Sequence, residues 1–147
     1  MGLVLPTIAV SPVQHLPMAQ ADADTMGLVE AIKQWVPTER AIDPGTVVLG
    51  MSLATWSGRR PLYRLAAFLT NQETALLLGQ AIPPEALQDD TVGRGVAGLE
   101  ATGPRQGLTA CAVRGERGVG FAPRYDHFAT TSRTVYGEYR PPEEAGE

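Results

Sequence analysis

Residue types that carry much of enzyme chemistry are scarce in this sequence. Its 147 residues include a single cysteine, Cys111, which excludes a disulfide within the chain and the paired cysteines of a zinc finger. Only two histidines occur, His15 and His127, and there is no Gly-x-Ser-x-Gly motif, which argues against a Ser-His-Asp hydrolase. We expect Cys111 to pack as a small apolar side chain, and we expect no metal site.

Long apolar runs are missing too. The N-terminal stretch GLVLPTIAV is short, is interrupted by Pro6 and has no basic flank, so it predicts neither a signal peptide nor a membrane span. We therefore expect a cytoplasmic protein that has no membrane partner and no small-molecule substrate. The apolar content of 44% is nevertheless sufficient for a core, and the length suits one domain of ordinary size.

Lysine is nearly absent, since eleven of the twelve basic residues are arginine. The formal net charge of −4 argues against a strong overall attraction to nucleic acid. The charge is uneven, however, because residues 105–140 hold six arginines against three acidic residues. Arginine forks suit phosphate contacts, although a GC-rich coding bias is the plainer explanation for the excess of arginine.

A mainly α domain is predicted for residues 23–117, because apolar residues recur there with helical spacing. Residues 1–22 predict an extended lead-in, since proline blocks a continuous helix. The prolines of this lead-in are Pro6, Pro12 and Pro17. The first helix is expected from Asp24 to Val36, with one apolar face.

The next two helices have clear start signals. Asp43 and Pro44 supply an N-cap and an N1 proline for a second helix, which is apolar on most sides and is therefore expected to be central. Gly58 ends this helix, and Pro61 starts a third. The inward positions of the third helix are expected to be Leu62, Leu65, Phe68 and Leu69.

Glycine is frequent in the two helices expected last. A helix that follows Gln88–Thr91 contains three glycines, each of which costs about 0.8–1 kcal/mol relative to alanine, so it is predicted to be weak. These glycines are Gly93, Gly95 and Gly98. Another helix is expected from Gly103 to Arg117, and Gly115, Gly118 and Gly120 are expected to loosen the chain before the strand. The inward residues of this helix are predicted to be Leu108, Cys111, Ala112 and Val113.

The short basic link Ser57-Gly58-Arg59-Arg60 between the second and third helices has two interpretations. Two helices joined by a glycine-containing turn have the general form of a helix-turn-helix, in which Arg59, Arg60 and Arg64 would face DNA. The plainer interpretation is an ordinary helical hairpin with solvated arginines. Sequence alone leaves both open.

Residues 124–139 are the one stretch with strong strand chemistry, because they are rich in β-branched and aromatic side chains. They predict a single strand or hairpin after the helices. Residues 140–147 are acidic and proline-led, and they predict a disordered tail.

Several motifs, in order, resemble those of insertion-sequence transposases that have a helical N-terminal domain of unassigned function ahead of an RNase-H-like DDE core. The family pattern H-F-D-T-T-S followed by V-x-G-[DE]-Y is similar to residues 127–139. Four earlier patterns, and an H-L-P element at His15, Leu16 and Pro17 ahead of them, bring the resemblance to roughly residues 15–139. The earlier matches are P-G-T-V-V-L at 44–49, S-G-R-x-P-L-Y-R-L-x-x-F at 57–68, L-L-L-G at 76–79 and N-D-D-T-V-G-R at 88–94, where Gln88 replaces the asparagine. The resemblance implies that residues 124–139 are the first strand of an incomplete RNase-H-like core.

This chain departs from the family pattern at the catalytic position. The family's first catalytic aspartate falls on Ala129, and a methyl group cannot hold the two Mg²⁺ ions that the complete family is expected to use. Asp126 lies an odd number of residues away, so a regular strand directs it to the opposite face unless a bulge intervenes. The remaining acidic residues of such a core would fall beyond Glu147.

The resemblance therefore implies a truncated, catalytically inactive transposase that binds no cofactor, with nuclease activity as the least favoured alternative. Its expected partners are element-end DNA, a full-length transposase or a second copy of itself. The candidate DNA-binding residues are Arg59, Arg60, Arg64, Arg94 and Arg133. The other function class that stays open is a helical remnant or protein-interaction module that does not bind DNA.

Overall fold

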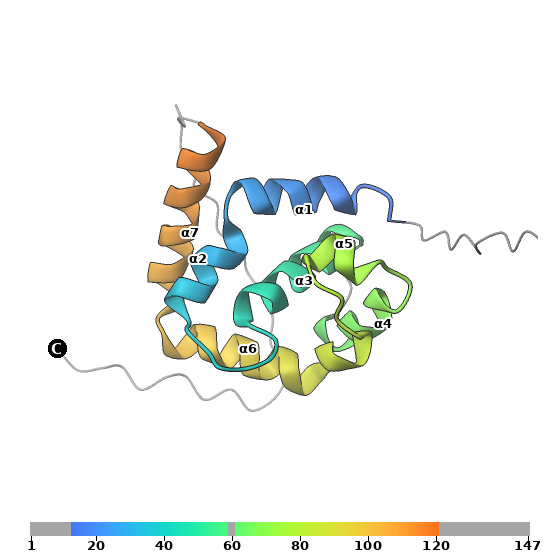
Figure 1. The fold of residues 1–147 in the computed structure, drawn as a ribbon. Coiled ribbons are helices and arrows are strands. Elements are labelled where there is room, and N and C mark those ends of the chain that lie inside the picture. Colours follow the sequence, from blue (N-terminus) through green and yellow to red (C-terminus); the bar gives the residue numbers. More distant parts are fainter. Residues whose placement is uncertain (1–12, 59–60, 121–147) are drawn as a thin grey trace, which may run out of the picture.

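The computed structural model describes residues 13–58 and 61–120, and this part of the chain is mainly α-helical (Figure 1). The strand predicted for 124–139, the tail 140–147 and the first part of the lead-in lie outside the described residues. The α-helices are α1 (Leu16–Thr25), α2 (Leu28–Trp35), α3 (Pro44–Trp56), α4 (Leu65–Leu69), α5 (Thr74–Leu78), α6 (Asp89–Ala101) and α7 (Pro104–Val119). Two short 3-10 helices, η1 (Leu62–Arg64) and η2 (Pro84–Leu87), precede α4 and α6. Within these ranges, none of the helices has the length and apolar character to cross a membrane.

Helix α3 lies at the centre of the domain, as its sequence predicts. In Figure 1 the helices α1, α2 and α6 surround α3 on three sides, and α4 and α5 lie on the remaining side. Eight of its thirteen residues are buried, and Val47 and Leu53 are each only 1% exposed. A helix that is apolar on most sides has no solvent face to keep, so its burial follows from its composition.

The start of α3 is held by a chain of polar contacts. The carboxylate of Asp43 accepts hydrogen bonds from the backbone N–H of Thr46 and from the Thr46 hydroxyl, each at 2.9 Å. The Thr46 hydroxyl in turn accepts from Nε2 of Gln80 at 3.2 Å, and Nζ of Lys33 lies 3.4 Å from Asp43 Oδ2. This network satisfies one of the free N–H groups at the start of α3. It also links α3 to Lys33 in α2 and to Gln80, which follows α5.

The first helix differs from its prediction in two ways. It begins at Leu16, so residues 16–22 are helical and not extended. Pro17 does not prevent this, because it occupies the first turn of α1, where a helix tolerates proline. The helix expected over 24–36 is divided into α1 and α2 by Gly27, whose φ of 61° lies in the left-handed region.

The later helices follow the predicted order but not all the predicted faces. Leu65, Phe68 and Leu69 of α4 are buried as expected, and α5 ends at Gly79 with a left-handed C-cap. In α7, however, Leu108 is 73% exposed, Val113 is 40% exposed and Ala112 is exposed, so the inward positions predicted there are wrong except for Cys111, which is partly buried. Helix α7 also continues to Val119, and the loosening predicted at Gly118 does not occur.

The inward face of α7 is made largely of glycine. A Cβ at Gly107 would overlap the indole ring of Trp35 in α2, and one at Gly118 would lie 2.6 Å from the carbonyl oxygen of Thr25. A Cβ at Gly115 would lie 3.3 Å from the sulfur of Met26. The absence of side chains therefore lets the backbone of α7 approach α2 and the end of α1 closely. A search for apolar periodicity cannot detect a face of this kind.

Two glycines of α6 also have a packing reason. A Cβ at Gly95 would lie 3.1 Å from Val47 Cγ1, and one at Gly98 would lie 3.4 Å from Val36 Cγ1. Gly93, by contrast, has nothing within 4 Å of its Cβ position. Helix α6 is continuous over its three glycines, and the space beside Gly95 is tight, so the prediction that these glycines weaken the helix stays a prediction.

The polar network at the start of α3 gives a first prediction. Replacing Asp43 with alanine should lower the free energy of unfolding by about 1–2 kcal/mol, because the N-cap acceptor is lost. Asp43→Asn retains an acceptor for the Thr46 N–H but loses the acceptor of the Thr46 hydroxyl and the contact with Lys33, whose side chain is 48% exposed, so its loss should be smaller than that of Asp43→Ala. Urea unfolding monitored by circular dichroism measures both. Equal stability of Asp43→Ala and wild type would show that the cap contributes nothing.

The glycines give a second prediction, with opposite signs at two helical positions. Gly93→Ala should raise the free energy of unfolding by roughly 0.5–1 kcal/mol, because alanine favours the helix and the site is open. Gly107→Ala should lower it by about 1–3 kcal/mol or more, because Trp35 must move. Thermal and urea unfolding of the two variants provide the comparison. A gain in stability at residue 107 would contradict the close packing of α7 on α2.

Candidate nucleic-acid interface

Of the five candidate arginines that sequence patterns favour, Arg64 and Arg94 lie within the described residues. Arg59, Arg60 and Arg133 lie outside them. Arg64 ends η1 and is exposed, with its guanidinium carbon 5.7 Å from the centroid of the neighbouring Tyr63 ring. Its cation-π contact is thus with an adjacent exposed side chain, and such contacts contribute little at exposed sites.

Arg94 lies in α6 with its charge compensated locally. Its Nη1 forms an ion pair with Asp90 one turn earlier, and its carbonyl oxygen accepts from Nη1 of Arg40 at 3.3 Å. Arg40 and Arg94 both line a surface hollow of about 500 Å³ together with Ile42 and Thr91. An exposed pair of this kind is weak and can be broken by another anion, but the acidic side chain remains beside it.

Tyr63 and Arg94 lie on opposite flanks of α6. Tyr63, next to Arg64, lines a hollow on one flank with Asp89, Val96 and Glu100. Arg94 faces the hollow on the other flank, which Thr91 and Gly95 line, and Asp90 lies beside it.

The geometry of α3 and α4 bears on the helix-turn-helix interpretation. Helix α4 has five residues, of which Leu65, Phe68 and Leu69 are buried. A recognition helix presents several side chains to the major groove, and the exposed positions on α4 and η1 are few. The ordinary helical hairpin is the interpretation that agrees better with these lengths.

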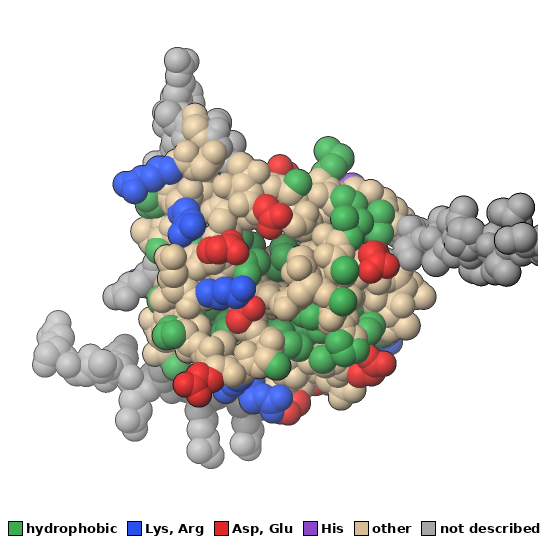
Figure 2. Space-filling view, in the orientation of Figure 1, with side chains coloured by type: hydrophobic (Ala, Val, Ile, Leu, Met, Phe, Trp, Pro, Cys, Tyr) green, Lys and Arg blue, Asp and Glu red, His purple; other side chains and the backbone are tan. Residues whose placement is uncertain are grey.

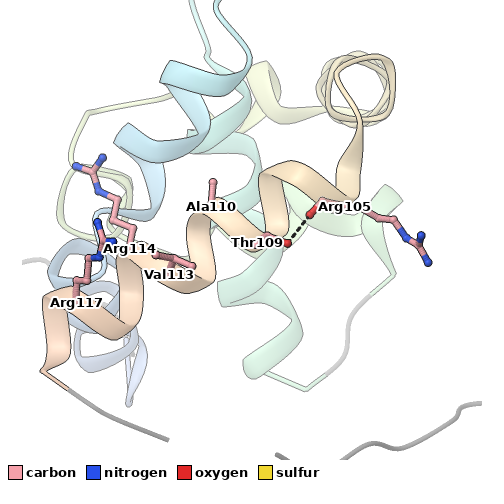
Figure 3. A pocket seen from close by; sticks show the side chains of 6 residues that line it. All are labelled: Arg105, Thr109, Ala110, Val113, Arg114 and Arg117. Atoms are coloured by element: carbon pink, nitrogen blue, oxygen red, sulfur yellow. Dashed lines mark hydrogen bonds between the residues drawn. The ribbon is translucent and has the colours of Figure 1, made fainter.

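Helix α7 carries a different group of basic side chains. Arg105, Arg114 and Arg117 line a shallow hollow of about 730 Å³ along this helix, with Thr109, Ala110 and Val113 between them (Figure 3). We call these six residues the arginine face. Figure 3 shows Arg114 and Arg117 close together towards the C-terminal end of α7, and Arg105 at the other end, pointing away from them.

The charge of α7 is opposite to that of the other described residues. Residues 104–119 hold three arginines and one acidic residue, Glu116, whereas residues 13–58 and 61–103 hold four basic and ten acidic residues. Figure 2 agrees, because basic side chains gather at the upper end of α7 while acidic and basic side chains alternate over the rest of that face. The described surface is therefore electrostatically divided.

The sequence patterns missed the arginine face as a site. The excess of arginine over residues 105–140 includes this helix, but no residue of α7 is among the five candidates. The signal that would have found it is spacing, because residues 105, 109, 113 and 117 recur every four positions, which places them on one side of a helix.

The described residues hold no group of three or more His, Cys, Asp or Glu side chains that could bind a metal ion. Position 129, where the resemblance expects the first catalytic aspartate, lies outside the part of the chain that the structure describes. The prediction that Ala129 abolishes metal binding therefore stays a prediction.

Cys111 lies between the two faces of α7 and is partly buried. It lines an almost wholly apolar hollow of about 310 Å³ with Trp35, Leu99 and Leu108. Burial raises the pKa of the thiol above its ordinary value, while the positive charge of Arg114 acts in the opposite direction. This side chain agrees with the expected role as a small apolar residue and not with a reactive thiolate.

The raised pKa gives a third prediction. At pH 8, iodoacetamide should alkylate Cys111 several-fold more slowly in the folded protein than in urea, because less thiolate is present and access is reduced. A thiol with a raised folded pKa stabilises the fold below its ordinary pKa, and this contribution is lost as the pH rises through the folded value. Arg114→Gln should slow alkylation further, since it removes the charge that favours the thiolate. Faster labelling of the folded wild type would contradict the burial of this residue.

Comparison with known proteins yields one similarity. No curated protein and no solved structure matches the chain. A family model described as "Domain of unknown function (DUF4277)" matches residues 8–113, a range that includes α1 to α6 and most of α7. Because this match covers well over half of the sequence, the chain belongs to the family defined by that domain of unknown function.

Proposed function

We propose that this chain is a transposase-family protein that associates with DNA and does not itself cut or join strands. The observation that carries the proposal is the series of motifs over residues 15–139, which resembles the helical domain and first core strand of insertion-sequence transposases. Membership in the DUF4277 family is compatible with this proposal, since it places one domain of unassigned function over residues 8–113. The mainly helical structure agrees with such a domain.

The proposed lack of catalysis follows from the chemistry of one position. A two-metal phosphoryl transfer requires carboxylates that hold both metal ions beside the reacting phosphate. Ala129 offers no ligand where the motif has its first aspartate. The described residues do not compensate for it, because they contain no alternative cluster of metal ligands. We accordingly propose no cofactor for this chain.

The proposed role is occupancy of the ends of a transposable element. A protein that binds these ends without cleaving them competes with a complete transposase for the same DNA. If it also retains the subunit contacts of its relatives, mixed oligomers would contain an inactive member. Both effects would make the chain an inhibitor of transposition.

A protein-interaction module is the second candidate, and a specific observation favours it. Several large apolar side chains are exposed on different helices, among them Met18 at 74%, Tyr63 at 63% and Trp56 at 53%. Singly exposed apolar residues are common, but together they offer contact area for another protein. This candidate requires no affinity for DNA.

The fourth prediction tests the proposed function by fluorescence anisotropy with the full chain. One labelled duplex carries the terminal repeats that flank the gene of this protein, and the other carries the same bases in scrambled order. We expect tighter binding to the repeats, and a binding constant that falls steeply with salt because phosphate contacts release counterions. Sedimentation of the free protein over a range of concentrations provides the control for self-association.

Negligible binding to both duplexes at low salt would overturn the DNA proposal. Self-association without DNA binding would then support the interaction module. Nicking of supercoiled DNA in Mg²⁺ that persists through purification and is absent from a mock preparation would contradict the proposed lack of catalysis.

A further inference from the structure

We propose that the arginine face of α7, and not the link between α3 and α4, contacts the phosphate backbone of duplex DNA. This inference rests on the proposed function and names the surface that performs it. The residues that carry the charge are Arg105, Arg114 and Arg117, and the small side chains of Thr109, Ala110 and Val113 leave the hollow between them open (Figure 3).

The first argument is the availability of the charges. Within residues 13–58 and 61–120, the ion pairs are those of Lys33 with Asp43 and of Arg94 with Asp90. None of the three α7 arginines pairs with a carboxylate of these described residues, whereas Arg94 pairs with Asp90 and must exchange that partner for a phosphate.

The second argument is the length of the face. A helix rises about 1.5 Å per residue, so Arg105 and Arg117 are separated by about 18 Å along the axis of α7. Duplex DNA carries one negative charge for roughly every 1.7 Å of its axis, so a single duplex offers phosphates to both ends of the face. Arginine suits this contact because its planar fork can hold two phosphate oxygens.

The third argument is that α7 is held from behind. The glycine positions at 107, 115 and 118 place its backbone against Trp35, Met26 and the Thr25 carbonyl. The guanidinium of Arg114 also lies over the backbone at Gly27, where a Cβ would be 2.7 Å from its Nε. The backbone of α7 is thus held in place and Arg114 packs on Gly27, so less conformational freedom is lost when a ligand binds.

The fourth argument is the field of the rest of the domain. The described residues before α7 hold ten acidic and four basic side chains, so they repel a polyanion and steer a duplex towards α7, the described α-helix with a positive balance. An acidic peptide would also be attracted, but it carries fewer charges per unit length than a duplex, which favours DNA as the occupant.

The fifth prediction compares two variants of the full chain that each remove two positive charges. Arg105→Gln with Arg117→Gln changes the arginine face and leaves Arg114 in its contact with Gly27. Arg64→Gln with Arg94→Gln makes the same change at the described candidates that sequence patterns favour. Circular dichroism and urea unfolding first establish that both variants fold. Anisotropy with the terminal-repeat duplex is then measured from low to moderate salt.

We expect the α7 variant to bind roughly 10- to 100-fold more weakly near 0.1 M salt and to lower the salt slope by about 1 for each arginine removed. The Arg64 and Arg94 variant should lose less than about threefold. Wild-type binding that survives the α7 substitutions, or that falls more in the other variant, would overturn the α7 inference and leave the proposed function in place. Absence of binding by the wild-type chain would overturn both.

A competition experiment separates DNA from an acidic protein partner. Poly-glutamate of matched charge is added to the wild-type complex with labelled duplex. Displacement only at a large molar excess is the expected result. Displacement at equal charge concentration, together with loss of poly-glutamate binding in the α7 variant, would show that the face accepts acidic peptides in general, and the assignment to DNA would be overturned.

Discussion

The contacts of Asp43 with Thr46 are the constraint on which the domain depends. They fix the start of α3, and α1, α2, α4, α5 and α6 all pack on that helix. Gln80 and Lys33 extend the same network to the end of α5 and to α2. Thr46 is the one polar residue among those buried in the described core, and its hydroxyl has partners on both sides. A buried polar group that is satisfied in this way fixes position as well as contributing stability.

Much of the fold could be predicted because its signals are local. An aspartate followed by proline marks the start of α3, and the run of apolar residues after it requires burial. The break at Gly27 was missed, since a glycine within an amphipathic pattern usually remains inside the helix. The faces of α7 were reversed for a related reason. Close backbone contact at Gly107 and Gly118 leaves no apolar side chain to count, so Leu108 was assigned to the interior although it is exposed.

For the candidate interface, too, some features follow from the local sequence and others depend on tertiary structure. Charge counting located the basic sector, because it needs only the sequence. Choosing among the arginines needed their neighbours, and those are set by tertiary structure. Arg94 was a reasonable candidate until Asp90 was found beside it, one turn away on the same helix. Arg105 and Arg117 gained importance only when the opposite side of α7 proved to be the packed one.

The contact between α2 and α7 also makes the domain optically informative. The indole N–H of Trp35 donates to the carbonyl oxygen of Thr102 at 3.2 Å, and its ring lies against the backbone at Gly107. The second tryptophan, Trp56, is 53% exposed at the end of α3. Separation of α7 from α2 would expose the indole ring of Trp35 to solvent and shift its fluorescence emission to longer wavelength. Trp56 is already in contact with water, so its emission would change little. The protein therefore carries an intrinsic fluorophore at the joint that positions its basic helix.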